Sequence, residues 1–423
     1  MTLNERNDAR EADPQRGSRG AAPPARLILE DGRVFRGRSF GAPAEGGVVA
    51  EVVFNTSHTG YQEVLTDPSY RFEAVCFTVP ILGIYGVTSE LDHQSAGPQA
   101  SAIICREVSR RASSWRSRWT LPEYMEAHGV PGIEGIDTRT LVHHLRDHGS
   151  KIGVLSTGDE PDEELVERAR RSPRMAGLDL AREVTTAEPY PWREGFAAEN
   201  APWGIALPEP MVTTGGRGEV VVVDFGVKRD ILRHLTARGF DVTVVPAGTP
   251  AGEVLERAPK GIFLSNGPGD PAAVTYGVET ARALIAAEGP PVFGVCLGHQ
   301  IISLAMGART HHLKFGHRGA NHPVREAETG RVLITSHNHG FAVDPASLQD
   351  TPLVASYESL FDGTLEGVRH RELPVEALQF HPEAGPGPHD AAGFFERFAR
   401  ATDAGARPAA VAGAAGRAAD ERA

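Results

Sequence analysis

The sequence is poor in cysteine, carries no excess of positive charge, and has no long apolar segment. Its three cysteines, Cys76, Cys105 and Cys296, are too few and too scattered for a disulfide framework, so we expect a reducing, cytoplasmic environment. Lys and Arg number 43 against 55 Asp and Glu, and this net charge of −12 disfavours nucleic acid or an anionic membrane surface as a partner. The best apolar candidate, residues 289–308, contains prolines, glycines and polar side chains that do not suit a membrane-spanning helix.

Composition divides the 423 residues into two globular parts between two tails. Residues 1–25 and 404–423 lack an apolar stripe, and we expect both to be disordered. Residues 187–218 are rich in proline and end in a glycine-rich run, which predicts a linker. We therefore expect an N-terminal domain over residues 26–186 and a C-terminal domain over residues 219–403.

In the first of these domains, strand patterns come before most of the helical ones. Asp31 and Gly32 predict a tight turn that closes a hairpin, and residues 48–54 have the pattern of an apolar strand. Three helices are expected afterwards, over residues 121–128, from an N-cap at Asp137 to a stop at Gly149, and over residues 163–171. This order indicates a smaller α+β domain.

In the second domain, strands and helices alternate. Apolar strands are expected at residues 220–224, 242–245, 261–265 and 292–295, and helices at residues 228–238, 274–287 and from about 298. Such alternation is typical of an α/β domain with a parallel sheet covered on both faces. The functional groups of these sheets lie beyond the carboxyl ends of the strands.

One of those strand ends carries a cysteine with the pattern of a nucleophile. Gly294 and Gly298 flank Cys296 in a G-x-C-x-G motif, which allows a sharp turn between a strand and a helix. The N-terminus of the following helix is expected to stabilise the thiolate, and the N–H of Leu297 is the expected donor to an oxyanion. Cys76 and Cys105 lack such a setting, and we expect them to be ordinary buried side chains.

Two further strand ends carry polar groups. His381 and Glu383 follow an apolar strand at residues 375–380, and at this spacing the carboxylate can orient the imidazole as a base for Cys296. The rigid turn at residues 265–271 (SNGPGDP) can offer backbone N–H groups to a carbonyl or carboxylate. Phosphate is the rival ligand there, but the segment matches neither glycine pattern of nucleotide-binding loops.

In this order, the three motifs resemble the class I (triad) glutamine amidotransferases. The N-terminal half resembles the small chain of carbamoyl-phosphate synthase through residues 54–63 (FNTSHTGYQE) and 65–70 (LTDPSY). The same family pattern continues at residues 136–139, 314–323, 338–341 and 381–390. The similarity covers the chain from about residue 27 to about residue 400.

The resemblance implies a flavodoxin-like C-terminal domain and a Cys296, His381 and Glu383 triad that hydrolyses L-glutamine. It also implies that glutamine is held by Ser57, Gly267, Gly269, Leu297, Gln300, Asn338, Gly340 and Phe341. The ammonia would pass to a large chain, which forms carbamoyl phosphate from bicarbonate and two ATP for arginine and pyrimidine synthesis. That partner would hold ATP and magnesium, and no cofactor is expected in this chain.

The sequence departs from the family at three positions near these motifs. His58 stands where Met is more usual, His337 where Gln is expected, and Gly385 where Ser is commoner. None belongs to the triad, so we expect activity to persist, with a pH dependence that the two histidines can alter.

A group of histidines raises the question of a metal. The group comprises His311, His312, His317 and His322. It has no cysteine and no nearby carboxylate, and its spacing fits no zinc pattern, so we expect a polar loop and no metal. Two other functions stay open from the residues alone, namely a glutaminase for a different synthetase and a catalytically silent partner subunit.

Overall fold

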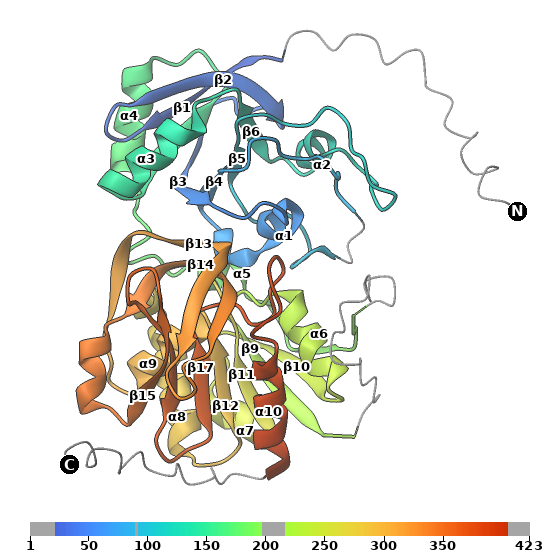
Figure 1. Ribbon diagram of the computed structural model, residues 1–423, viewed down its shortest axis with the longest axis vertical. Coiled ribbons are helices and arrows are strands. Elements are labelled where there is room, and N and C mark those ends of the chain that lie inside the picture. The colour runs from blue at the N-terminus through green and yellow to red at the C-terminus, as the bar shows by residue number, and fades with distance from the viewer. Residues whose placement is uncertain (1–21, 89–91, 197–215, 405–423) are drawn as a thin grey trace, which may run out of the picture.

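The computed structural model describes residues 22–88, 92–196 and 216–404, which form two domains (Figure 1). The predicted tails lie mostly outside these residues. Strand β1 (Pro24–Leu29) nevertheless begins inside the first predicted tail, and helix α10 (Gly393–Ala404) reaches the start of the second. Within the described ranges, no helix has both the length and the apolar character needed to cross a bilayer.

The N-terminal domain is a closed seven-stranded barrel with helices around it. Its other strands are β2 (Val34–Gly41), β3 (Val48–Asn55), β4 (Glu73–Phe77), β5 (Ala102–Ile104), β6 (Pro131–Glu134) and β7 (Lys151–Ser156). They close in the order β1-β2-β6-β5-β4-β3-β7. The helices are α1 (Tyr61–Thr66), η1 (Pro68–Tyr70), α2 (Leu121–Ala127), α3 (Thr138–His148), α4 (Asp162–Arg171) and α5 (Ala181–Val184).

The local signals in this domain are confirmed, but its topology was not foreseen. Strands β1 and β2 form the expected antiparallel hairpin, with Gly32 at a φ of 90° in its turn. Helix α3 begins where the Asp137 carboxylate accepts the N–H of Thr140, and it ends at Gly149, whose φ is 86°. The expectation that strands come first was wrong, because α1 precedes β4, and α2 and α3 separate β5, β6 and β7. Strands β3 to β6 also pair in parallel.

The C-terminal domain is built on a ten-stranded sheet in the order β14-β13-β15-β16-β17-β12-β11-β9-β10-β8. Its strands are β8 (Tyr190–Trp192), β9 (Glu219–Asp224), β10 (Asp241–Pro246), β11 (Gly261–Leu264), β12 (Val292–Val295), β13 (Thr310–Glu326), β14 (Val332–Val343), β15 (Leu353–Ser359), β16 (Leu365–His370) and β17 (Val375–Leu378). Its main helices are α6 (Arg229–Ala237), α7 (Ala251–Glu256), α8 (Thr275–Ala286), α9 (Leu297–Ala305) and α10.

Five central strands of this sheet are parallel and are buried on both faces. The run β10-β9-β11-β12-β17 is the predicted flavodoxin-like core. Val221 and Val223 of β9 pack on the side of α8 and α9, whereas Val220 and Val222 pack on the side of α6 and α10. The antiparallel strands β13 to β16 were not predicted, because their polar sequence lacks a clear alternation.

The predicted linker begins with a strand. Strand β8 pairs antiparallel with β10 at the edge of the sheet, despite Pro191 in its centre. Proline is tolerated at an edge because its missing N–H need not face another strand. The rest of the linker region, including Trp203, lies mostly outside the described residues.

The junction between β12 and α9 depends on two glycines that allow backbone to approach backbone. A Cβ at Gly298 would lie 2.2 Å from the carbonyl oxygen of Leu264 on β11. A Cβ at Gly294 would lie 2.8 Å from Ile302 Cδ1 on α9. Both glycines of the G-x-C-x-G motif therefore let α9 pack close to the sheet.

We expect Gly298→Ala to lower the unfolding free energy by about 1–3 kcal/mol, because the added methyl group overpacks the junction. The matched control is Gly252→Ala in α7, where a Cβ meets nothing within 4 Å. That change should raise the unfolding free energy by about 0.5–1 kcal/mol through helix propensity. Urea unfolding followed by circular dichroism measures both changes, and an equal response of the two variants would contradict this description of the junction.

Candidate active site

Cys296 and His381 leave the sheet at neighbouring strand ends. Strands β12 and β17 run parallel in register, with Val295 beside Leu378. The N–H of Cys296 donates to the carbonyl of Leu378 at 2.8 Å, and the N–H of His381 donates to the carbonyl of Ser336 on β14 at 2.8 Å. The topology thus brings the predicted nucleophile and base to one edge of the parallel core.

Cys296 occupies a turn that ordinary residues avoid. Its φ is 54° and its ψ is −105°, and it is the N-cap of α9. Its side chain is 2% exposed, and the Sγ–H donates to the carbonyl of Asn338 at 3.6 Å. This conformation between a strand and a helix is the sharp turn that the flanking glycines predicted.

The expectation of a stabilised thiolate was wrong for this closed arrangement. Burial raises the pKa of the Cys296 thiol well above its ordinary value, and the charges of Asp67 and Glu383 raise it further. The N–H of Leu297 and the ammonium of Lys228 lower this pKa by less. The helix N-terminus therefore acts in the expected direction, but burial outweighs it, and Cys296 is a thiol that needs a base.

The hydrogen bonding of His381 suits the predicted role of a base. Its Nδ1 lies 2.6 Å from Glu383 Oε1, so Nδ1–H donates to the carboxylate and Nε2 keeps its lone pair. His381 Nε2 is buried and has no hydrogen-bond partner among the described residues. The carboxylate thus fixes the imidazole tautomer, as the spacing of the two residues predicted.

A buried lysine completes this network and was missed by sequence reasoning. Lys228 Nζ lies 3.0 Å from Glu383 Oε1, and both side chains are almost fully buried. Burial alone would raise the pKa of Glu383, but Lys228 and His381 lower it to about 2. Lys228 also donates to the carbonyl of Ala384. Its position between strand β9 and helix α6, at a strand end of the parallel core, is the signal that could have revealed it.

A small cavity beside the cysteine brings together most of the residues that were predicted to bind glutamine. Its volume is about 30 Å³, and the predicted residues that line it with Cys296 are Gly267, Gly269, Gln300, Asn338, Gly340 and Phe341. The amide of Gln300 donates to the carbonyl of Phe341 at 2.8 Å, and that of Asn338 donates to Asp67 Oδ2 at 3.2 Å. At this volume the cavity is small, with room for about two water molecules.

Ser57 and Leu297 are predicted ligands that do not line this cavity. Ser57 is buried in the N-terminal domain, and its Oγ has no hydrogen-bond partner within the described part of the chain. Leu297 follows the nucleophile directly, and its N–H is close enough to lower the pKa of the thiol. The structure therefore places Leu297 beside the sulfur, and Ser57 is not among the residues that line the cavity.

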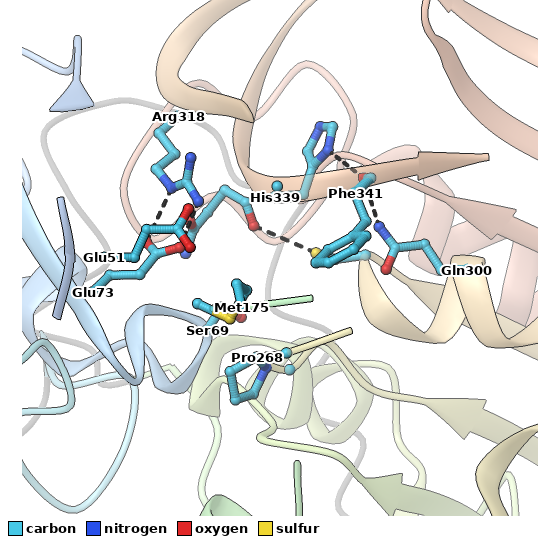
Figure 2. Close-up of a pocket in the computed structure, with 14 residues that line it drawn as sticks. Glu51, Ser69, Glu73, Met175, Pro268, Gln300, Arg318, His339 and Phe341 are labelled. Carbon is cyan, nitrogen blue, oxygen red and sulfur yellow. Dashed lines mark hydrogen bonds and ion pairs between the residues drawn. The ribbon is translucent and has the colours of Figure 1, made fainter. Parts of the chain in front are cut away.

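Several residues that were not predicted as glutamine ligands also line the cavity. They are Glu51, Ser69, Glu73 and Met175 of the N-terminal domain and Arg318 of the C-terminal domain, and of these Ser69 and Arg318 lie in the family segments 65–70 and 314–323. Arg318, on β13, forms a buried ion pair with Glu73 on β4, so the two domains meet at the cavity. Figure 2 shows Glu51, Glu73 and Arg318 across the cavity from Gln300 and Phe341.

The histidines that depart from the family pattern have different settings. His58 is exposed, whereas His337 is 2% exposed. Burial and neighbouring imidazoles hold the pKa of His337 well below its ordinary value. It therefore stays neutral near pH 7, and the expectation that it adds a titrating group was wrong.

The histidine group expected in a polar loop lies instead on a strand. His311 and His312 are exposed on β13, and His317 and His322 are buried farther along it. His317 faces His337, His339 and Glu366, and one donor atom from each of these four residues lies within 4.8 Å of the others. Sequence analysis missed this group because its members come from three separate strands.

Comparison with known proteins supports the family resemblance of both halves of the chain. Residues 221–401 match the family described as glutamine amidotransferase class-I, and residues 27–155 match carbamoyl-phosphate synthase small chain, CPSase domain. A carbamoyl phosphate synthase small chain of Syntrophotalea carbinolica is 51% identical over 373 residues, which cover 88% of this chain and 96% of that protein. Its counterpart from Nostoc sp. is 51% identical over 377 residues, covering 89% and 95%. The chain therefore belongs to the carbamoyl phosphate synthase small chain family.

Proposed function

We propose that this chain is the glutaminase subunit of a carbamoyl-phosphate synthase and delivers ammonia to a large, ATP-using partner. The observation that carries the proposal is the buried imidazole of His381. Glu383 fixes its tautomer, and Nε2 has no hydrogen-bond partner in the described part of the chain, at the strand ends where Cys296 lies. This is the arrangement required to activate a thiol nucleophile.

In the proposed reaction, His381 Nε2 accepts the thiol proton as Cys296 Sγ attacks the amide carbon of glutamine. The developing oxyanion accepts the N–H of Leu297. His381 then returns the proton to the leaving nitrogen, which departs as ammonia, and a thioester forms. Water, deprotonated by His381, hydrolyses the thioester to glutamate and restores the thiol.

The ammonia is consumed by the partner, which we propose holds ATP and magnesium and joins ammonia to bicarbonate as carbamoyl phosphate. Ammonia is protonated in water, so transfer requires a sealed interface between the two chains. The three free, buried cysteines suit a reducing cytoplasm, where we propose that the complex acts in arginine and pyrimidine synthesis.

The direct test is to purify the tagged chain from its own cells and to assay the eluate with glutamine, bicarbonate and ATP. We expect a large co-purifying chain and carbamoyl phosphate as product. A stable complex with a different synthetase, and no carbamoyl phosphate, would instead make the chain a glutaminase for another enzyme.

We expect Cys296→Ala to abolish glutamine use and to leave ammonia use intact. Glutamine-dependent synthesis by the purified complex should fall at least about a thousandfold, the scale for loss of a covalent nucleophile. Synthesis from added ammonium chloride should persist, because that reaction bypasses the cysteine. Cys105→Ala, a change at a buried cysteine of the barrel, should preserve both activities. A silent partner subunit predicts no effect of Cys296→Ala on either substrate.

Lys228→Met tests the cation that keeps Glu383 ionised. Because Glu383 has a folded pKa of about 2, below the ordinary 4.5, its contribution to stability is complete above pH 4.5 and is lost only as pH falls through about 2. Without Lys228, burial raises this pKa, and an uncompensated buried carboxylate costs about 3–5 kcal/mol near neutral pH. Acidification to about pH 5 should protonate the carboxylate and reduce the difference in unfolding free energy between the variant and the wild type.

Urea unfolding at the two pH values measures this effect, with the exposed Lys260→Met as the matched control. Glutaminase activity of Lys228→Met should fall about 10–100-fold, as for other residues that orient a reacting group. If the loss of unfolding free energy in Lys228→Met were the same at both pH values, Lys228 would not act through Glu383.

A further inference from the structure

Four buried side chains form a compact group of possible metal ligands behind the glutamine cavity. His317 comes from β13, His337 and His339 from β14, and Glu366 from β16. Their exposed fractions are 6%, 2%, 4% and 0%. Neither oxygen of Glu366 has a hydrogen-bond partner within the described ranges, although each is fully buried. A carboxylate in this setting either pairs with a cation or takes up a proton, and burial raises the pKa of Glu366 to about 7.

The outer nitrogens of the three imidazoles determine which inner nitrogens carry lone pairs. His339 Nδ1 lies 2.9 Å from the carbonyl of Phe341, which can only accept, so this nitrogen is protonated. His337 Nε2 lies 2.8 Å from the hydroxyl of Thr335, whose own hydrogen is donated to the carbonyl of His322. Therefore Nε2 of His337 is also protonated, and its Nδ1 is not.

Two lone pairs consequently face each other. His337 Nδ1 and His339 Nε2 are 3.2 Å apart, which is repulsive unless a cation lies between them. The third imidazole follows the same pattern, because His317 Nε2 donates to the carboxylate of Asp362 at 2.9 Å and turns Nδ1 toward Glu366. Donation of the outer N–H to a carboxylate or carbonyl is the usual environment of histidines that bind a metal.

The distances between the inner donor atoms suit one small ion. His317 Nδ1 is 3.4 Å from Glu366 Oε1, and the nearest contacts of His337 and His339 with Glu366 Oε2 are 3.6 and 4.0 Å. In a tetrahedral zinc site, bonds of about 2.0–2.1 Å put the ligands about 3.3 Å apart. The separation of 3.2 Å between His337 and His339 and that of 3.4 Å between His317 and Glu366 are close to this value, and the longer ones, up to 4.8 Å, require the side chains to move inward around an ion.

The charges also balance. Three neutral imidazoles and the carboxylates of Glu366 and Asp362 offset a divalent ion. Burial and neighbouring imidazoles hold the pKa of both His337 and His339 well below the ordinary value, which favours the neutral form that binds metal. Burial lowers the pKa of His317, but the carboxylates of Asp362 and Glu366 raise it to about 9. A proton on His317 therefore competes with a metal ion for this site. That proton would leave the lone pairs of His337 and His339 still opposed.

We propose that His317, His337, His339 and Glu366 bind one zinc ion as a closed structural site. Imidazole and carboxylate donors suit zinc, and four protein ligands leave no open position for catalysis. The proposal replaces our expectation of no metal, which rested on the spacing of four histidines along the sequence. Three of the four ligands were absent from that group, and folding brings them together. It stands independently of the proposed glutaminase function.

The site would fix the strand that faces the nucleophile. His337 and His339 flank Asn338, whose carbonyl accepts the Cys296 thiol. His339 donates to the carbonyl of Phe341, which also accepts the amide of Gln300. A metal bound on one face of β14 would therefore fix the strand. It would thereby hold the carbonyls of Asn338 and Phe341 in their positions beside Cys296 and Gln300.

The test is the zinc content of the full-length chain, purified without a histidine tag and dialysed, measured by inductively coupled plasma mass spectrometry. We expect about one zinc ion per chain in the wild type, and less than about a tenth of that in Glu366→Gln and His337→Gln. The matched control is His311→Gln, which removes an exposed histidine of β13 and should keep the full content. Asp362→Asn should weaken zinc affinity about 10–100-fold through loss of the outer hydrogen bond.

Two further measurements guard against misfolding of the variants. Cobalt added to the metal-free wild type should give the visible absorption of a tetrahedral ion, and zinc should raise its unfolding temperature. His337→Gln, which restores the residue usual in the family, should show neither response while keeping its circular dichroism spectrum. A wild type that takes up no zinc, or variants that keep it, would overturn the proposal.

Discussion

The site depends on the strained backbone of Cys296. A non-glycine residue at a φ of 54° costs about 1–3 kcal/mol, so the conformation persists only where its surroundings enforce it. Here β17 holds the N–H of Cys296 and the first turn of α9 holds its carbonyl, which accepts the N–H of Gln300 at 3.1 Å. The same turn places the Leu297 N–H beside the sulfur and Gln300 beside the cavity. The predicted nucleophile, the predicted oxyanion donor and one predicted substrate ligand are thus positioned by the same turn.

Burial favours the neutral form of both Cys296 and Glu383, but the outcome differs between the two groups. It raises the pKa of the Cys296 thiol, which leaves the nucleophile protonated until a base acts. It would also neutralise Glu383, but Lys228 keeps that carboxylate ionised and His381 correctly oriented. In the proposed reaction, the same exclusion of water would protect the thioester and retain ammonia as the free base. A protonated thiol beside an oriented imidazole is compatible with that reaction.

Sequence reasoning succeeded where a local pattern determines the structure. The parallel strands, the glycines around Cys296, and the His381 and Glu383 pair all follow from spacing and periodicity within a few residues. It did not find Lys228, Glu73 or Glu366, because each acts on a group far away in the sequence. Closure of the barrel and the antiparallel strands β13 to β16 were missed for a related reason. They are determined by pairing between distant segments, and the polar residues of β13 serve contacts with the other domain.

Strand β13 connects the N-terminal barrel to the strand that contacts Cys296. The carbonyl of Arg318 accepts the N–H of Thr56, and its guanidinium pairs with Glu73, so the strand is tied to the barrel by backbone and charge. The ring of Phe315 stacks on that of Phe54 at 5.6 Å. The neighbouring His317 faces β14, the strand whose Asn338 carbonyl contacts the nucleophile. Removal of the barrel would take away the carboxylate partner of Arg318 and several residues that line the cavity. The N-terminal domain is therefore part of the candidate site.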